Sequence, residues 1–229
     1  MKDLDTKYGC SVLDSNVEFG IKQVTTDCGR YYVTPSGMEY PSVTTVVSII
    51  NAKKIAEWEK SVGKEKADSI KKEAGEHGTR WHSLMEDTVL GKKHVIPFGA
   101  EFFKVYPKIL NEVLPLITDV VFAERRMYSD TLEVAGTVDL VAKYDHKMSV
   151  IDWKTTRNFK DAQDCLSYWC QLASYSVMLK ERYGIEVEQL VLVFNDDDSN
   201  IYVLKTDKID TWVNNFKKVR QKYKDINGV

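Results

Sequence analysis

Residues 134–154 constrain the fold of this chain most strongly, because they predict two β-strands joined by a tight polar turn at residues 144–147. Successive side chains of a strand point to opposite faces of its sheet. Asp152 and Lys154, two residues apart in the second strand, therefore project from the same face. Asp139 in the first strand lies between two apolar residues and also faces away from an apolar layer. Pairing of the strands as a hairpin would bring two carboxylates and an ammonium group together at one end of a sheet.

These residue types predict a particular chemistry. Aspartate is depleted in strands, and a sequence that accepts such a local cost repeatedly is expected to do so at a functional site. Carboxylates are hard oxygen ligands that suit Mg²⁺ or Mn²⁺, and Lys154 supplies a compact positive charge. A bound metal would polarise a phosphodiester and lower the pKa of a water molecule, while Lys154 orients that water or stabilises developing charge. The alternative for a lone Asp-x-Lys pair is a solvated surface hairpin.

Five segments of the chain, spanning about residues 40 to 180, resemble the PD-(D/E)xK nuclease superfamily in its RecB-like branch. They occur in the order typical of that branch, and the first is similar to a segment of the mitochondrial genome maintenance exonucleases and their phage relatives. The five segments are Pro41–Thr45, Gly78–His82, Gly136–Asp139, Ile151–Thr155 and Gln171–Tyr175.

The resemblance implies a restriction-endonuclease-like α/β fold, with a mixed central sheet flanked by helices, in a single nuclease domain over residues 1–229. Residues 1–16 are expected to form a loose N-terminus and residues 116–205 the catalytic core. Residues 41–92 are expected to form a helical arch through which a single DNA strand threads. The lysines of this region would guide the strand. Trp58 and Trp81 would provide stacking platforms, although core packing is the alternative for both tryptophans.

The resemblance also assigns roles to individual residues. It implies that Asp139, Asp152 and His82 hold the metal, and Glu124 matches the less constant first acidic position of the family. Lys154 would position the nucleophilic water. Gln171 and Tyr175, one helical turn apart, would orient Lys154 or a substrate phosphate.

A second group of residues is expected to contact DNA. Ser42, Thr44 and Thr45 can donate hydroxyl hydrogen bonds to a phosphate, as positioning contacts do. The same residues also fit the N-cap of a helix that starts near Val43, and both roles are compatible. Three further residues, which lie within or directly after the matching segments, complete the expected DNA contacts: Arg80, Thr155 and Arg157.

Hydrophobic periodicity predicts the remaining elements. A helix over residues 64–90 should bury one stripe and end at Gly91; the stripe comprises Ala67, Ile70, Ala74, Trp81, Leu84 and Thr88. The other expected elements are small hairpins over 17–40, helices over 52–63, 98–114 (broken at Pro107), 162–183 and 210–224, a strand over 116–128 and a hairpin over 190–204.

Composition narrows the class of protein. The chain has 229 residues, which suit one α/β domain, and its net charge of −2 argues against tight non-specific coating of DNA. Its four cysteines lack zinc-site spacing, so free thiols are expected and no iron–sulfur cluster. No apolar run approaches the roughly 20 residues that span a bilayer. The N-terminus lacks a signal or transit pattern, so we expect an intracellular, cytoplasmic protein of phage or microbial origin.

These observations predict a Mg²⁺- or Mn²⁺-dependent DNA exonuclease that acts on single strands or free ends in replication, recombination or repair. One alternative is a structure-specific or restriction-type endonuclease that uses the same ions. A second is a non-catalytic DNA-binding protein that assists recombination. The intact pattern of Asp139, Asp152, Lys154, Gln171 and Tyr175 argues against the second alternative. Protein partners are not predicted by the sequence.

Overall fold

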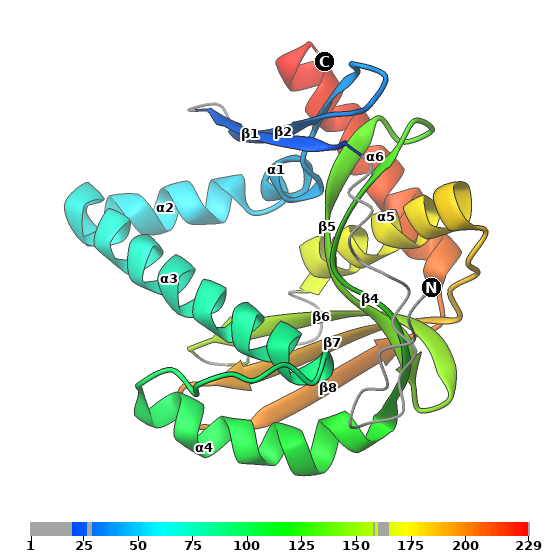
Figure 1. Ribbon diagram of the computed structural model, residues 1–229. Helices are drawn as coiled ribbons and strands as arrows, with labels where there is room; N and C mark the ends of the chain where they lie inside the picture. The colour runs from blue at the N-terminus through cyan, green and yellow to red at the C-terminus, as the bar shows by residue number, and fades with distance from the viewer. Residues whose placement is uncertain (1–19, 27–28, 158, 160–164, 229) are drawn as a thin grey trace.

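The computed structural model describes residues 20–26, 29–157, 159 and 165–228. The expectations for residues 1–19, for Cys10 and Cys28 and for the start of a helix at Ala162 fall outside these ranges. The described strands form two sheets, one of three strands in the order β1-β2-β3 and one of five strands in the order β4-β5-β6-β7-β8 (Figure 1). In the described part of the chain, no helix combines the length and the apolar character needed to cross a bilayer.

The five-stranded sheet is mixed, as expected. Its strands are antiparallel except for the β6–β7 pair, which is parallel. Parallel neighbours require a crossover connection, and helix α5 (Leu166–Tyr183) provides it before ending at Gly184. The strands are β4 (Ile117–Ser129), β5 (Val134–Tyr144), β6 (Lys147–Thr156), β7 (Gln189–Asp196) and β8 (Ile201–Thr206).

The predicted hairpin is the β5–β6 pair. Tyr144 and Lys147 are paired, so the loop between them contains only Asp145 and His146. Both loop residues have positive φ, 51° and 69°, as a two-residue type I′ turn requires. This turn sets the register of the two strands and therefore the relative positions of Asp139 and Lys154.

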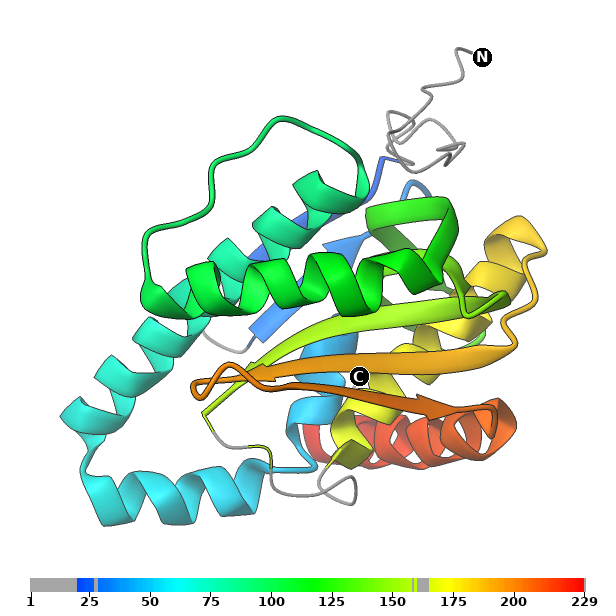
Figure 2. The ribbon, with the colours of Figure 1, turned by 90° about the horizontal axis from the view of Figure 1, so that it is seen from below.

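Helices cover both faces of the five-stranded sheet. On one face Val150 of β6 packs in a core with α5, α6 (Ile209–Asn227) and α1 (Val43–Ser48). On the other face Ile151 and Trp153 pack in a core with α3 (Lys64–Val89) and α4 (Ala100–Lys108). In Figure 1, α4 lies below β6–β8 and α5 lies above them, and Figure 2 shows α4 in front of the strands. The alternation predicted for β6 is confirmed.

Helices α2 (Ala52–Val62) and α3 (Lys64–Val89) form a helical hairpin that projects from the core (Figures 1 and 2). Gly63 joins them with a φ of 84°, and an ion pair between Lys71 and Glu59 connects them. With 26 residues, α3 is about 39 Å long. Trp81 is 1% exposed and belongs to the core, whereas Trp58 is half-buried.

The predicted buried stripe of α3 is wrong in its middle. Ala74 is exposed and Ile70 is only half-buried, whereas the other four residues of the stripe, Ala67, Trp81, Leu84 and Thr88, are buried. The physical reason is that α3 joins the core only near its C-terminal end, through Trp81, Leu84, Met85 and Val89. Its central turns border a cavity, which periodicity alone cannot distinguish from a core.

Helix α4 (Ala100–Lys108) begins two residues later than predicted and contains Pro107. It continues as a π-helix (Ile109–Val113) and a 3₁₀ turn (Leu114–Leu116) before β4. The expected break near the proline is therefore a change of helical type, since proline removes a backbone donor from the helix.

The small sheet and α1 precede the helical hairpin. The sheet comprises β1 (Lys22–Thr26), β2 (Gly29–Val33) and β3 (Glu39–Pro41). It packs on β5 through a small core in which Tyr32, Tyr40 and Ala135 are buried. Ser42 caps α1, because its side chain accepts a hydrogen bond from the backbone N–H of Thr45. The helix start expected at Val43 is confirmed.

Candidate active site

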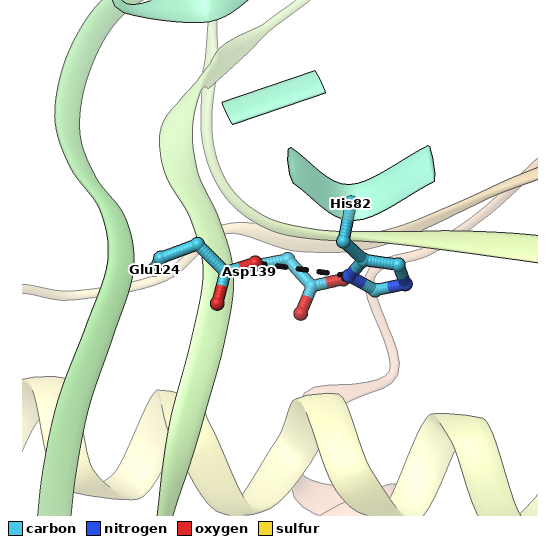
Figure 3. Close-up of side chains that lie close together, drawn as sticks. All are labelled: His82, Glu124 and Asp139. Atoms are coloured by element: carbon cyan, nitrogen blue, oxygen red, sulfur yellow. Dashed lines mark ion pairs between the residues drawn. The ribbon is translucent and has the colours of Figure 1, made fainter. Parts of the chain in front are cut away.

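Three side chains from three elements meet at the inner side of α3. His82 projects from α3, Glu124 from β4 and Asp139 from β5 (Figure 3). His82 Nδ1 lies 3.2 Å from Asp139 Oδ2 and 3.7 Å from Glu124 Oε1. One potential ligand atom of each residue lies within 4.8 Å of those of the other two. This spacing is close enough for one ion to contact all three residues.

Glu124 lies directly across the strand pair from Asp139, between the paired residues Ala123–Leu140 and Arg125–Val138. Like charges that face each other across two strands destabilise a sheet. The backbone of Glu124 also has a φ of 48°, a left-handed conformation that is uncommon for residues other than glycine. Two local costs at one position indicate a function, because strained residues gather at active and ligand-binding sites.

The electrostatics of this cluster depend on His82. Burial disfavours its charged form, but the carboxylates of Asp139 and Glu124 outweigh that effect and raise the pKa of His82 to about 10. Burial alone would raise the pKa of Asp139, yet the charges of His82 and Lys154 hold it below the usual value. Burial raises the pKa of Glu124. The two carboxylates thus share the positive charge of one imidazolium.

The cluster suits a divalent metal ion. It combines two carboxylates with one imidazole, and oxygen-rich donor sets favour Mg²⁺ or Mn²⁺. A metal ion would supply the positive charge that the His82 imidazolium provides in this structure, and it would relieve the repulsion between Glu124 and Asp139. The cluster contains three of the four residues expected to hold metal. The fourth, Asp152, lies outside it.

Asp152 and Lys154 form an ion pair beside the cluster. Lys154 Nζ lies 2.6 Å from Asp152 Oδ2, and Asp152 is 2% exposed. Apart from this pair, Asp152 Oδ2 accepts no hydrogen bond from the described residues. Burial raises the pKa of Asp152 to about 7, even though Lys154 opposes the shift. The ammonium also lies 5.1 Å from the centre of the Tyr168 ring, a cation–π contact that the sequence did not indicate.

Gln171 and Tyr175 reach this pair from α5, but not by the contact we expected. Gln171 Nε2 donates to Asp152 Oδ1 at 3.3 Å, and no described contact joins it to Lys154. Tyr175 is hydrogen-bonded to Gln171 and packs over Gly136, where a Cβ atom would lie 2.8 Å from the phenol oxygen. Gly136 is thus the residue that lets β5 pass directly beneath Tyr175.

All but one of the predicted chemical residues border one cavity of about 590 Å³. His82, Glu124, Asp139 and Lys154 line one part of it, together with Gln171 and Tyr175, whereas Asp152 lies behind Lys154. Three polar residues that sequence reasoning missed line another part: Gln23, Arg30 and Arg126. The strand containing Arg30 was predicted, but nothing in its local pattern indicates which distant elements it faces.

The hydroxyl groups expected to bind phosphate are largely used within the protein. The side chain of Ser42 caps α1, and Thr45 Oγ1 donates to the carbonyl of Arg30 at 3.2 Å. Thr44 Oγ1 lies 2.9 Å from Ser42 Oγ, but Thr44 is exposed and lines the cavity with Ser42. Of the three residues, Thr44 is the one best placed to donate to a bound ligand.

The other expected DNA contacts lie elsewhere. Arg80 lies with Lys71 and Lys72 along a separate depression on α3, and its guanidinium lies 6.0 Å from the centre of the Phe102 ring. Thr155 and Arg157 line a second cavity of about 390 Å³, which α3 also borders. These residues do not join the cavity that contains the carboxylate cluster.

Comparison with known proteins identifies a family for these residues. The model of the PD-(D/E)XK nuclease superfamily matches residues 52–228. Mitochondrial genome maintenance exonuclease 1 of Xenopus tropicalis is 30% identical over 126 residues, which are 53% of this chain. The matched region is 36% of the length of that relative.

Solved structures show more distant likeness. The structure of SSO0001 aligns over 79% of this chain and 75% of its own, with a TM-score of 0.41 and 15% identity. A protein of Eubacterium rectale, named as a candidate exonuclease, aligns over 55% of this chain and 51% of its own, with a TM-score of 0.40 and 12% identity.

Proposed function

Because this chain belongs to the PD-(D/E)XK nuclease superfamily, we propose that it is a metal-dependent deoxyribonuclease that removes nucleotides from free ends of single-stranded DNA. The observation that carries this proposal is the cluster of His82, Glu124 and Asp139, which borders the same cavity as Lys154. Mitochondrial genome maintenance exonuclease 1, to which the chain is similar, supports end-dependent cleavage.

In this proposal His82, Glu124 and Asp139 hold a Mg²⁺ or Mn²⁺ ion, and Asp152 borders the site. When bound, the ion would neutralise charge on the scissile phosphate and activate a water molecule. The protein residues bring the ion and the phosphate together at the inner side of α3, which is the task of positioning that catalysis requires.

Lys154 supplies the fixed positive charge. Its ammonium is paired with Asp152 and lies beside the Tyr168 ring, so the side chain is oriented before substrate arrives. Gln171 donates to Asp152 and thereby holds the partner of Lys154. A positioned charge of this kind stabilises negative charge that develops on the phosphate without reorganising during the reaction.

Guidance of a DNA strand toward the site is supported by the α2–α3 hairpin. Seven lysines are distributed over this hairpin, and lysine side chains attract the phosphates of a nucleic-acid backbone. Their positions are Lys53, Lys54, Lys60, Lys64, Lys66, Lys71 and Lys72. In the proposal, these residues guide a strand toward the cavity that the central turns of α3 border.

The test is digestion of a linear single-stranded DNA, labelled at its 5′ or 3′ end, beside a closed circular single strand. Each reaction contains Mg²⁺, Mn²⁺ or EDTA. The proposal predicts metal-dependent shortening of the linear strand alone, with loss of activity in Asp139→Asn and Lys154→Ala. Both variants are compared with Lys143→Gln, which changes a half-buried lysine that pairs with Asp119 outside the cavity.

Two other outcomes would contradict the proposal in different ways. Cutting of the circle by the purified protein would indicate an endonuclease. Binding of DNA without cutting in any of the metals would indicate an accessory protein whose nuclease core has a structural role.

A further inference from the structure

The small N-terminal sheet contributes to the lining of the cavity that contains the carboxylate cluster. Gln23 of β1 and Arg30 of β2 line it, and Arg126 of β4 lies in the same wall. Residues 22–41, which form this sheet, precede the region that the superfamily model matches, which begins at residue 52. The sheet therefore adds a positively charged wall to a cavity that the matched region builds in part.

The register of the small sheet directs these residues to one face. Gln23 pairs with Tyr32, and Arg30 lies two residues before Tyr32 on the same strand. Because side chains alternate, Gln23, Arg30 and Tyr32 share a face. The hydroxyl oxygens of Tyr32 and of Thr137 in β5 lie 3.4 Å apart. This contact holds the shared face of the small sheet against β5. Lys22 is exposed and belongs to the opposite face.

The backbone of Arg30 is held on both sides. Its N–H donates to Thr45 Oγ1 at 3.1 Å, and its carbonyl accepts from the Ser42 N–H at 2.8 Å. Gly29 makes this close approach feasible, because a Cβ atom there would lie 2.8 Å from Thr45 Cγ2, and its φ of 124° disfavours other residues. The chain thus uses a glycine, a cap residue and a threonine to fix one arginine.

The guanidinium of Arg30, in contrast, forms no hydrogen bond or ion pair with any described residue. Arg126 contributes a second guanidinium, one nitrogen of which donates to the Ile21 carbonyl at 3.5 Å. Arg30 is exposed at a cavity on a fixed backbone, so its guanidinium is available to a ligand with negative charge. The fork of a guanidinium matches the oxygens of a phosphate.

We propose that Arg30 and Arg126, with Gln23, form a phosphate-binding subsite that holds a DNA phosphate other than the one being cleaved. This inference rests on the proposed function, since it concerns the same cavity. The subsite fixes how far the strand extends past the carboxylate cluster. Its ligand is either an internal phosphodiester or a terminal phosphate, and the two sources are separated by experiment.

The test measures binding without cleavage. A fluorescent single-stranded oligonucleotide is titrated with protein in EDTA at several salt concentrations, and its anisotropy is recorded. Arg30→Gln should weaken binding about tenfold, as expected for the loss of one charge-assisted hydrogen bond. It should also reduce the slope of log affinity against log salt by about 0.7, the value for one phosphate contact on a single strand.

Lys22→Gln is the matched control, because it removes the same charge from the other face of the same sheet. Its affinity and salt slope should equal those of the original protein. Arg30→Lys should restore the salt slope, because the charge is retained. An Arg30→Gln protein that is folded and binds with unchanged affinity and slope would overturn the inference. Gln23→Glu, which adds negative charge to the same wall, should also weaken binding and provides an independent variant.

Oligonucleotides with a phosphorylated end and with a hydroxyl end distinguish the two possible ligands of the subsite. If the subsite holds a terminal phosphate, the original protein binds a phosphorylated end more tightly than a hydroxyl end, and Arg30→Gln removes the difference. If it holds an internal phosphodiester, Arg30→Gln weakens binding equally for both ends.

The outcome for the proposed function is separate. Metal-dependent cleavage with unchanged binding by Arg30→Gln would leave the nuclease proposal intact and reject the subsite. If Arg30→Gln weakens binding but the original protein does not cleave DNA, the subsite is supported and the nuclease proposal is rejected.

Discussion

Lys154 Nζ lies 2.6 Å from Asp152 Oδ2 at a position where both side chains are largely buried, Lys154 being 17% and Asp152 2% exposed. Each group therefore depends on the other for the stability of its charge. Removing one partner of a buried ion pair leaves the other unpaired, which is typically more damaging than replacing both.

Lys154→Met should destabilise the metal-free protein by about 3 kcal/mol at pH 8 and by much less at pH 5. The pKa of Asp152 is already about 7, above its value in the unfolded chain, so the folded protein holds this proton more tightly. The stability contributed by that proton is present at low pH and is lost as pH rises toward 7 and above. In Lys154→Met, the stability that is lost as the pH rises is larger, because the ionised Asp152 then has no positive partner. Urea unfolding in EDTA at both pH values measures it, and an equal effect at pH 5 and pH 8 would contradict the argument.

Asp139→Asn should weaken the binding of Mn²⁺ at least tenfold, because Asp139 supplies one of the two carboxylates in the cluster with His82. Calorimetric titration of the protein with Mn²⁺ alone measures this directly. Asp87→Asn, which alters a carboxylate that pairs with Lys92 at the surface of α3, is the control. Equal Mn²⁺ affinities of Asp139→Asn and Asp87→Asn would show that the metal does not bind at the cluster.

Gly136→Ala should destabilise the protein by about 1–3 kcal/mol, as overpacking of a full interior does. The added Cβ would lie 2.8 Å from the Tyr175 oxygen and 2.9 Å from its Cε1, so Tyr175 must move. Because Tyr175 is hydrogen-bonded to Gln171, nuclease activity should fall as well. Thermal unfolding and the digestion assay measure the two effects. An unchanged melting temperature would show that the α5–β5 contact has room that the structure does not indicate.

Gly75→Ala should have the opposite effect. Gly75 lies inside α3, and a Cβ built there meets no atom within 4 Å. Alanine in a helix interior is more stable than glycine by about 0.5–1 kcal/mol. Gly184→Ala is the contrasting variant, because the φ of 67° at the end of α5 disfavours alanine there. The free energy of unfolding, measured by chemical denaturation, should rise for Gly75→Ala and fall for Gly184→Ala.

Much of the fold follows from local sequence. The alternation around Asp152 and Lys154 predicted both the faces of β6 and the hairpin turn, because a period of two and a short polar loop leave few arrangements. Glycine positions predicted the ends of α3 and α5 for a similar reason. The middle of α3 was mispredicted at Ala74, since a cavity wall and a core wall have the same periodicity.

The candidate site could be predicted only in part. Asp139 was proposed from the strand pattern as well as from the family resemblance, His82 and Glu124 from the resemblance alone, and the structure brings the three together. Asp152 lies outside the cluster because Gln171 and Lys154 hold it. The approach of Arg30 depends on how a separate sheet packs, and no local pattern encodes that contact.

The parallel pairing of β6 with β7 has a consequence for how the protein folds. The antiparallel strands β4, β5 and β6 are consecutive in the chain, so the segment that contains Glu124, Asp139 and Lys154 can pair through short loops. The β6–β7 pair must wait until the chain has crossed back through α5, and such long-range closure is slow. We expect refolding to assemble the acidic strands first and to seal Asp152 beneath Gln171 last.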